Sequence, residues 1–381
     1  MIDALFWLCA FGATYSYFLY PLVLRCLPVR RRVTLAAPSL SEAALPTLTL
    51  IVTAHNEQAR IERKLANTLA LDYPRDRLQV IVASDASTDA TDAIVQRHAG
   101  DGVQLVRPAE RLGKENAQGT AIAAATGEIL VFSDVATEIP PDALRRIAAG
   151  FAADPGIGAI SSEDRFISRN GEIAGEGAYV RYEMWLRKLE SERAGLVGLS
   201  GSFFAARREV CAAWDIHVPS DFNTALNCAR LGRCAISHPE VLGFYEDVQD
   251  PSREYLRKVR TVLRGITAIA RHPNVLSPRF GTFALQVWSH KIMRWLVPWF
   301  LLALLPLNAL LVGTHPVYGL AALAQAGFYG VALAGHLSPR LRALLPVRIV
   351  YFFVQVNLAI ADATQQFLRG QRMTVWSPTV R

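Results

Sequence analysis

Hydrophobic and polar positions divide this chain into long apolar runs and a middle stretch of short alternating segments. Residues 4–24 are almost wholly apolar or aromatic, and further apolar runs cover residues 296–313, 317–336 and 347–363. A helix of about 20 apolar residues crosses the hydrocarbon core of a bilayer, which is about 30 Å thick. The pattern therefore predicts membrane-spanning helices on either side of a domain that is built in another way.

Charges beside these runs indicate their orientation. Asp3 precedes the first run and Arg25 and Arg30 follow it, the reverse of the charge order in a cleaved secretory signal. Basic residues flank the cytoplasmic ends of membrane helices, so the chain after Arg25 is expected in the cytoplasm and its amino terminus outside. The turn at residues 314–316 carries no Lys or Arg and is expected outside, whereas Arg340 and Arg348 mark a return to the cytoplasm.

The run at residues 347–363 leaves two possibilities open, because it contains Gln355, Asn357 and Asp362. It either spans the membrane with these polar side chains facing neighbouring helices, or lies in the interface and leaves the Arg residues that follow it inside. Hydropathy alone does not decide between them.

Between the apolar ends, strand-like and helix-like segments alternate. A linker containing Pro, Ser and Ala at residues 34–46 leads to β-rich apolar runs at residues 48–53, 78–83 and 128–133, with helical patterns at residues 59–70 and 89–98 between them. This succession predicts a mostly parallel sheet covered by helices on both faces. Ligands of such α/β sheets bind beyond the carboxyl ends of the strands.

Composition narrows the class of partner. Lys and Arg outnumber Asp and Glu by 40 to 33, giving a net charge of +7, and the excess lies near the apolar segments rather than in one basic patch. We therefore expect membrane lipids and diphosphates as partners and no nucleic acid. The five cysteines form no CxxC pair, so neither a zinc site nor a disulfide framework is indicated, which fits a reducing cytoplasm.

Polar residues follow the first two predicted strands. Asn56 and Glu57 lie in the loop after residues 48–53, and Asp85 ends the strand at residues 78–83. Ser87, Thr88 or Asp89 could cap the next helix, but capping does not explain Asp85. A carboxylate at a strand end can accept hydrogen bonds from a nucleobase N–H or ribose hydroxyls, so these residues are candidates for substrate binding.

Two further residues are candidates for binding phosphate and metal. Lys114 immediately precedes an Ala-rich helical run, where exposed N–H groups already favour anions such as a diphosphate. Asp134 ends the apolar run at residues 128–133 and is the clearest candidate ligand for a divalent cation, although an Asp at that position could also cap the turn before Pro140.

Taken in order, these segments resemble glycosyltransferase family 2, above all its membrane-bound members that build bacterial exopolysaccharides. The similar segments are residues 54–57, 84–91, 113–118, 125–134, 175–177, 182–183, 201–205, 220–222, 257–261 and 289–291. The resemblance implies a GT-A fold, that is, a Rossmann-like α/β domain with a mostly parallel sheet, here cytoplasmic and joined to transmembrane helices. It also implies use of nucleotide diphosphate sugars with Mg²⁺ or Mn²⁺.

The resemblance assigns roles to particular residues. Asp85 matches the acid that binds the nucleotide, Asp134 the first acid of the DxD motif that holds the metal, and Asp221 the general base. Arg257 and Arg260 fall on the QxxRW segment, beside the acceptor and the diphosphate. A basic helix resting on lipid headgroups explains these two arginines equally well.

Three positions depart from the family pattern. Ala136 replaces the second acid of the DxD motif, Ser220 the acid before the base, and Thr261 the QxxRW tryptophan. Metal binding by Asp134 would then depend mainly on phosphates and water. Because that tryptophan resembles a sugar platform in processive synthases, its absence favours addition of one sugar per encounter.

The expected organisation is a transmembrane helix at residues 1–25, a linker at 26–45, a GT-A domain at 46–248, an interfacial helical segment at 249–295, a transmembrane region at 296–368 and a tail at 369–381. The expected function is inverting sugar transfer to a lipid-linked or saccharide acceptor at the cytoplasmic membrane face, with a polysaccharide-assembly complex as a further expected partner. A transferase that charges polyprenyl phosphate, and a catalytically silent partner of a polysaccharide synthase, are the alternatives. Donor sugar, acceptor and processivity stay open.

Overall fold

The computed structural model describes residues 1–31, 40–167, 178–246 and 251–373. Contacts group the chain into two units. The sheet unit comprises Leu27–Gln249, Ala268–Gln286 and Met373–Arg381, and the helical unit comprises Met1–Cys26, Asp250–Thr267 and Val287–Arg372. Residues 32–39 of the predicted linker and the segment at residues 175–177 lie outside the described residues.

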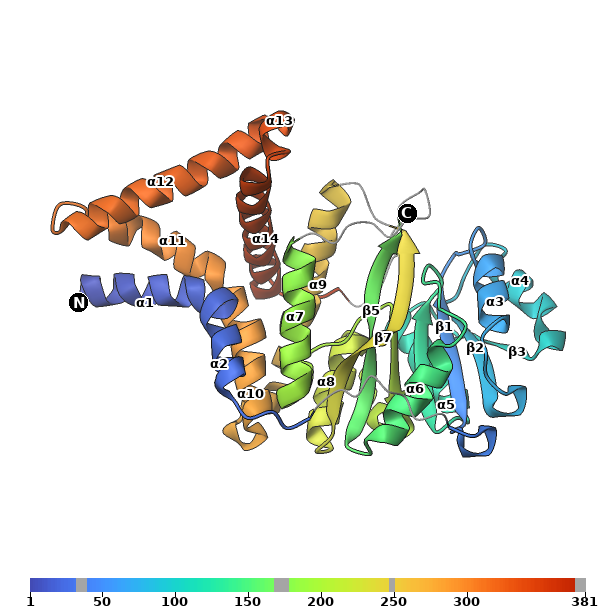
Figure 1. The fold of residues 1–381 in the computed structure, drawn as a ribbon. Helices are drawn as coiled ribbons and strands as arrows, with labels where there is room; N and C mark the ends of the chain where they lie inside the picture. Colours follow the sequence, from blue (N-terminus) through green and yellow to red (C-terminus); the bar gives the residue numbers. More distant parts are fainter. Residues whose placement is uncertain (32–39, 168–177, 247–250, 374–381) are drawn as a thin grey trace. The chain divides into compact units, whose positions relative to one another are not determined.

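A seven-stranded sheet with the order β3-β2-β1-β4-β6-β5-β7 forms the centre of the sheet unit (Figure 1). Its strands are β1 (Leu48–Ala54), β2 (Leu78–Ser84), β3 (Val103–Val106), β4 (Ile129–Asp134), β5 (Ile157–Ile167), β6 (Phe203–Arg207) and β7 (Cys234–Glu246). Strand β6 runs antiparallel to both of its neighbours, and the other pairings are parallel. The mostly parallel α/β fold predicted from the alternating segments is confirmed.

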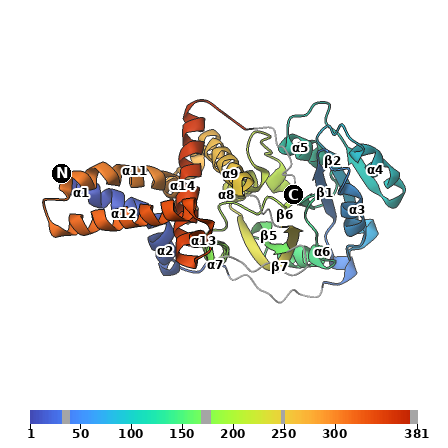
Figure 2. The same cartoon turned by 90° about the horizontal axis from the view of Figure 1, so that it is seen from above.

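Helices cover both faces of this sheet. They are α3 (Ile61–Leu69), α4 (Thr91–Arg97), α5 (Lys114–Ala124), α6 (Ala143–Ala153), α7 (Ala178–Arg193) and α8 (Ser220–Arg230). Side chains of α3, α4 and α6 pack with one face of the central strands, and those of α5 and α8 pack with the other. Figure 2 shows α5 and α6 on opposite sides of the sheet. Every residue of β1 is buried, as expected for a parallel strand enclosed on both faces.

Register brings the ends of three central strands to one level. Ala54 at the end of β1 pairs with Ser84 at the end of β2, and Thr53 pairs with Asp134 at the end of β4. Because these strands are parallel, the loops that follow them leave the same edge of the sheet. The sequence motifs that follow the strands are therefore neighbours in space.

The helical unit contains long apolar helices. It includes α1 (Ile2–Thr14), α2 (Tyr20–Cys26), most of α9 (Pro251–Arg271), α11 (Met293–Leu311), α12 (Pro316–Leu337), α13 (Pro339–Arg342) and α14 (Leu345–Leu368). The short helix α10 (Thr282–Val287) leads into α11 without a break. Four helical stretches are long and apolar enough to cross a membrane, namely Ile2–Cys26, Thr282–Leu311, Pro316–Leu337 and Leu345–Leu368.

Two of these stretches extend beyond the apolar runs read from the sequence. The run predicted from residue 296 continues a helix that already begins at Thr282, and the run at residues 347–363 lies within the unbroken helix α14. Polar side chains within α14 have internal partners: the Asn357 amide donates to the Phe353 carbonyl, and Asp362 accepts from the Tyr255 hydroxyl at 3.5 Å. Length and composition thus allow α14 to span.

Candidate active site

The loops after β1 and β2 hold each other in place. Asn56 and Ala86 both adopt left-handed backbone conformations, with φ of 51° and 50°. Such conformations are costly for residues other than glycine and persist where neighbouring contacts enforce them. Here the Asn56 side-chain carbonyl accepts from the Thr88 amide at 2.8 Å, and the Asn56 amide donates to the Ser87 hydroxyl at 3.1 Å. Asn56 therefore shapes the loop that follows β2.

Asp85 lies at the junction of three segments and has no exposed surface. Its amide donates to the Ala54 carbonyl at 2.8 Å, and its Oδ1 accepts from the Gly113 amide at 3.1 Å. Its Oδ2 has no hydrogen-bond partner within the described chain, and Arg111 Nε lies 3.9 Å away. A buried carboxylate oxygen without a donor is costly, so this atom is suited to accept a ligand N–H or hydroxyl.

Glu57 is buried beside this junction, with 4% of its surface exposed. Its amide donates to the Thr91 hydroxyl at 2.8 Å, and its carboxylate accepts from Arg60 at 2.7 Å. Burial raises the pKa of Glu57, and the Arg60 guanidinium opposes this effect. Asp89, and not Ser87 or Thr88, accepts from the Thr91 amide at the start of α4, at 2.9 Å.

Lys114 begins α5 directly after Gly113, whose φ of 106° is accessible at low cost only to glycine. The Lys114 ammonium donates to Asp134 Oδ1 at 2.5 Å and to the Gly201 carbonyl at 2.8 Å. Only 7% of the Lys114 surface is exposed, whereas 27% of the Asp134 side chain is. The Lys114 ammonium is thus fixed at the end of β4, beside an Asp134 carboxylate that solvent and a ligand can reach.

Asp221 lies in the first turn of α8, beside the same glycine. A Cβ atom placed on Gly201 would lie 3.5 Å from Asp221 Oδ2, which puts the Asp221 carboxylate next to the residue whose carbonyl binds Lys114. Asp85, Lys114, Asp134 and Asp221 are therefore connected through Gly113 and Gly201, and we call these four residues the rim. The sequence motifs that contain them converge at one edge of the sheet.

The rim can hold a divalent metal only with help from a ligand. Asp134 offers a partly exposed carboxylate, but Ala136 brings no oxygen, and the described residues contain no group of three or more His, Cys, Asp or Glu side chains suited to a metal. Mg²⁺-like cations are commonly held by one or two carboxylates together with substrate phosphates and water. One carboxylate beside a phosphate-binding lysine fits that arrangement.

Three parts of the site were not identified from sequence. The Gly201 carbonyl is one, and Asp164 is a second: its carboxylate accepts from the Ser200 hydroxyl at 2.7 Å and the Ser202 hydroxyl at 3.0 Å, which holds the Gly201 segment. Neither has a local sequence signal, because both depend on long-range pairing of β5 with β6.

The third is Lys64 of α3, of which 2% is exposed. Its ammonium donates to the Ser133 hydroxyl at 2.8 Å and the Thr137 carbonyl at 2.5 Å, on either side of Asp134. Burial lowers the Lys64 pKa to about 7, although Asp134 and Glu138 oppose the shift. A signal did exist, because Lys64 falls at helical spacing among the buried residues Ile61, Leu65 and Thr68.

Arg257 and Arg260 lie on the part of α9 that belongs to the helical unit, whereas the rim lies in the sheet unit. The Arg257 guanidinium pairs with Glu254 at 2.7 Å, and 48% of its side chain is exposed. Their roles beside the diphosphate and the acceptor stay predictions.

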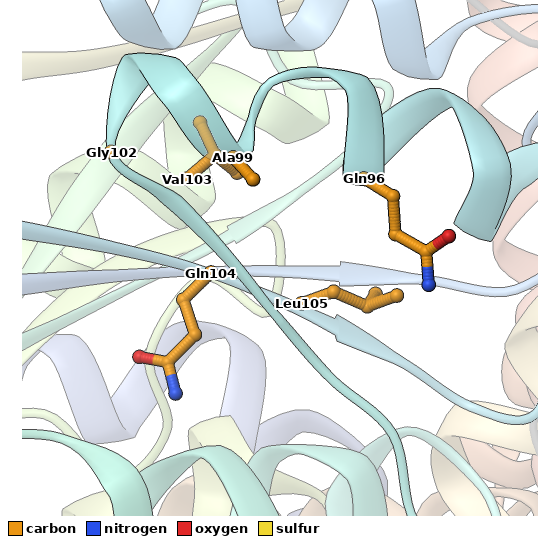
Figure 3. Close-up of a pocket in the computed structure, with 6 residues that line it drawn as sticks. All are labelled: Gln96, Ala99, Gly102, Val103, Gln104 and Leu105. Carbon is orange, nitrogen blue, oxygen red and sulfur yellow. The ribbon is translucent and has the colours of Figure 1, made fainter.

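A groove of about 570 Å³ lies elsewhere on the sheet unit (Figure 3). Its lining residues are Gln96, Ala99, Gly102, Val103, Gln104 and Leu105, which come from the end of α4 and from the edge strand β3. These side chains are apolar or amide-bearing and include no acid, base or nucleophile. The chemistry of the rim, rather than the size of this groove, identifies the candidate site.

Comparison with known proteins identifies the family of the sheet unit. Residues 49–214 match the family model of glycosyl transferase family 2. The chain is 30% identical over 179 residues to β-monoglucosyldiacylglycerol synthase of Synechocystis, covering 45% of this chain and 37% of that protein. It is 24% identical over 226 residues to poly-β-1,6-N-acetyl-D-glucosamine synthase of Staphylococcus aureus, covering 54% and 53%. The chain thus spans about half or less of these relatives.

Solved structures show the same fold. The mannosyltransferase of Pyrobaculum calidifontis, determined in complex with GDP-Man and Mn²⁺, aligns with 98% of this chain and 100% of its own at a TM-score of 0.74 and 24% identity. The five cysteines of this chain are free, as expected. The family resemblance read from the motifs is confirmed over residues 49–214, which form a glycosyltransferase family 2 domain with a GT-A fold.

Proposed function

We propose that this enzyme transfers one sugar, with inversion, from a nucleotide diphosphate donor to a lipid-linked or saccharide acceptor at the cytoplasmic face of the inner membrane. Its product would serve exopolysaccharide or other cell-surface polysaccharide synthesis. The relatives support both acceptor classes, since the name of one denotes a glucosylated diacylglycerol and that of the other a polymer of N-acetylglucosamine.

The observation that carries this proposal is the position of Lys114 between Asp134 and Gly201, with Asp221 beside Gly201. The Lys114 ammonium is suited to stabilise a leaving diphosphate, and the Asp221 carboxylate is suited to accept a proton. Both lie beside Gly201. These are the two charges that a single displacement at an anomeric carbon requires.

At the donor, the bond between the anomeric carbon and the β-phosphate oxygen breaks, and its electron pair leaves with the nucleoside diphosphate. Lys114 stabilises the negative charge that develops there, because a fixed cation needs no reorganisation as the bond breaks. Asp85 Oδ2 accepts a hydrogen bond from the nucleoside, which is favoured because no described residue donates a hydrogen bond to that atom.

At the acceptor, a hydroxyl oxygen forms the new bond to the anomeric carbon from the opposite face, and its proton passes to Asp221. General-base assistance of this kind is typically worth about a hundredfold to ten-thousandfold in rate. Attack opposite the leaving group gives inversion.

Asp134 would hold Mg²⁺ or Mn²⁺ together with the donor phosphates. When bound, such a cation supplies Lewis-acid neutralisation of the phosphate oxygens. Asp134 would contribute a single carboxylate, which lies beside Lys114. Its turn is held in place because the Asp134 amide donates to the Ser202 carbonyl at 2.9 Å.

A transferase that charges polyprenyl phosphate is the second candidate, and its acceptor would also be a lipid at the membrane surface. A silent partner of a polysaccharide synthase was suggested by Ala136 and Ser220, but retention of Lys114, Asp134 and Asp221 in one rim favours an enzyme. The four candidate spans and the basic residues that flank them support an inner-membrane location with a cytoplasmic sheet unit.

The test is to incubate membranes that contain the chain with a panel of nucleotide sugars and to identify the nucleotide that is released and the labelled acceptor. We expect one donor to be consumed, with release of its nucleoside diphosphate and label in a lipid-extractable or saccharide product. Label in polyprenyl phosphate would select the second candidate. No consumption of any donor, with or without added lipid extract, would reject both.

A further inference from the structure

The turn that carries Asp134 is held from beneath by a charged side chain. Lys64 reaches from α3 to the underside of this turn, with 2% of its surface exposed. Its ammonium donates to Ser133 just before Asp134, at 2.8 Å, and to the Thr137 carbonyl just after the turn, at 2.5 Å. One group thus fixes both ends of the segment.

The turn has its own hydrogen bonds, but they are few. The Thr137 amide donates to the Asp134 carbonyl at 3.2 Å, and the Ser133 hydroxyl donates to the same carbonyl at 3.1 Å. The Lys64 ammonium adds a second link between Ser133 and Thr137, and the Ser202 carbonyl accepts from the Asp134 amide at 2.9 Å and from the Thr137 hydroxyl at 3.4 Å. The orientation of the Asp134 carboxylate depends on this set.

A lysine at this position needs an explanation. Lys64 occupies the core-facing side of α3, where an apolar residue would avoid the cost of burying an ammonium. Polar groups buried at such cost are often found at functional sites. The nearby negative charges of Asp134 and Glu138 favour the ammonium, and its two acceptors lie on the turn rather than on the body of the sheet.

We propose that Lys64 is a positioning residue: its buried ammonium holds the turn at residues 133–137 so that Asp134 faces the metal and diphosphate of the donor. This inference rests on the proposed function. It assigns to α3 a part in donor binding that no sequence motif indicated.

The test uses the full chain in detergent, with Lys64→Met as the main variant. Methionine keeps most of the side-chain length and removes the charge and its hydrogen bonds. Arg63→Met is the matched control, since it removes a neighbouring cation of α3 that pairs with Glu138 at 2.7 Å and is 74% exposed. Ser133→Ala removes one of the two acceptors with little risk to folding, and the double variant Lys64→Met/Ser133→Ala measures their coupling.

Two readouts are compared. Hydrogen exchange measures the protection of the Asp134 and Thr137 amides. These amides donate to the Ser202 and Asp134 carbonyls respectively. Calorimetry reports binding of UDP, GDP, CDP and dTDP in the presence of Mn²⁺. Loss of a residue that orients a metal ligand typically costs about ten- to hundredfold in metal affinity, so we expect a loss of that size for Lys64→Met. Ser133→Ala should show a smaller loss and add nothing to Lys64→Met, whereas Arg63→Met should match wild type.

Faster exchange of the two amides in Lys64→Met, together with this loss of binding, would support the inference. Wild-type exchange rates in Lys64→Met would show that Lys64 does not hold the turn. Faster exchange with wild-type nucleotide affinity would show that Lys64 has no role in donor binding. If Lys64→Met fails to fold, Ser133→Ala decides by the same two criteria. If the wild-type chain binds none of the four nucleotides, the proposed function fails, and the role of Lys64 in donor binding fails with it. The exchange data then still show separately whether Lys64 holds the turn.

Discussion

The two ends of the rim are held in different ways. At the nucleotide end, Asn56 and Asp85 are fixed mainly by hydrogen bonds to backbone amides, including those of Thr88 and Gly113. At the phosphate end, Lys114 is fixed by its pairing with Asp134, and Lys64 lies beneath the turn. Single hydrogen bonds to backbone amides contribute modestly and locally, whereas removing one member of a buried charge pair leaves the other uncompensated. Substitutions at the phosphate end should therefore have the larger effects.

Replacing the proposed base, Asp221, should reduce sugar transfer more than any other substitution. Asp221→Asn keeps the size of the side chain but cannot accept a proton, so transfer should fall about a hundredfold to ten-thousandfold while nucleotide binding stays unchanged. Steady-state transfer assays and nucleotide calorimetry on the same preparation measure both. Asp76→Asn, an exposed acid ahead of β2, is the control. Near wild-type transfer by Asp221→Asn would place the base elsewhere.

Removing the cation should come next. Lys114→Met abolishes a charged hydrogen bond to the donor diphosphate, and such bonds contribute about 1.5–3 kcal/mol, or roughly ten- to hundredfold in affinity. Calorimetry with a nucleoside diphosphate and Mn²⁺ measures the loss, and Arg97→Met, an exposed cation at the end of α4, serves as the control. Equal affinity in wild type and Lys114→Met would show that the diphosphate binds away from the rim.

Lys64 offers a pH test of the phosphate end. Its pKa is about 7 in the folded chain and 10.5 in the reference state, so the unfolded chain binds more protons between these values. The free energy of unfolding should therefore rise with pH across this window, by at most about 1.4 kcal/mol per pH unit from this group. Unfolding of wild type and Lys64→Met at pH 7 and pH 9 measures the difference, and an identical pH dependence in the two proteins would contradict it.

The nucleotide end should respond least. Asn56→Ala removes the hydrogen bond to the Thr88 amide and leaves a residue with a Cβ in a left-handed conformation, for a combined cost of about 1–2 kcal/mol. Asn56→Gly loses the same hydrogen bond but keeps the backbone freedom, so it should be the milder variant. Thermal unfolding midpoints compare them, and a larger loss for glycine would show that the backbone conformation is not the reason.

Much of the fold could be predicted because the central strands are short apolar runs with polar residues at their ends. The runs at residues 48–53, 78–83 and 128–133 correspond to β1, β2 and β4, and Asp85 and Asp134 lie where those strands end. The insertion of the antiparallel strand β6 between β4 and β5 could not be predicted, because it depends on pairings distant in the sequence. The helix start at Thr282 was missed because polar residues near His290 interrupt the apolar pattern.

The candidate site divides in the same way. Lys114 and Asp134 were found because a charged residue at a strand or helix end has few structural explanations, whereas Asp221 was assigned from the resemblance to glycosyltransferase family 2. The Gly201 carbonyl that binds Lys114 is a backbone group and leaves no trace in residue type. Asp164 and Lys64 act on the rim through other groups, so the folded arrangement shows their part in the site, although the helical spacing of Lys64 among buried residues was a sequence signal.

An experimental structure of the full chain with a nucleoside diphosphate and Mn²⁺ tests the central claim most directly. We predict the β-phosphate within hydrogen-bonding distance of the Lys114 ammonium, the metal on Asp134, and the base or ribose against Asp85 Oδ2. Density for the nucleotide in the groove beside β3, or at any place where it contacts neither Lys114 nor Asp134, would contradict the account.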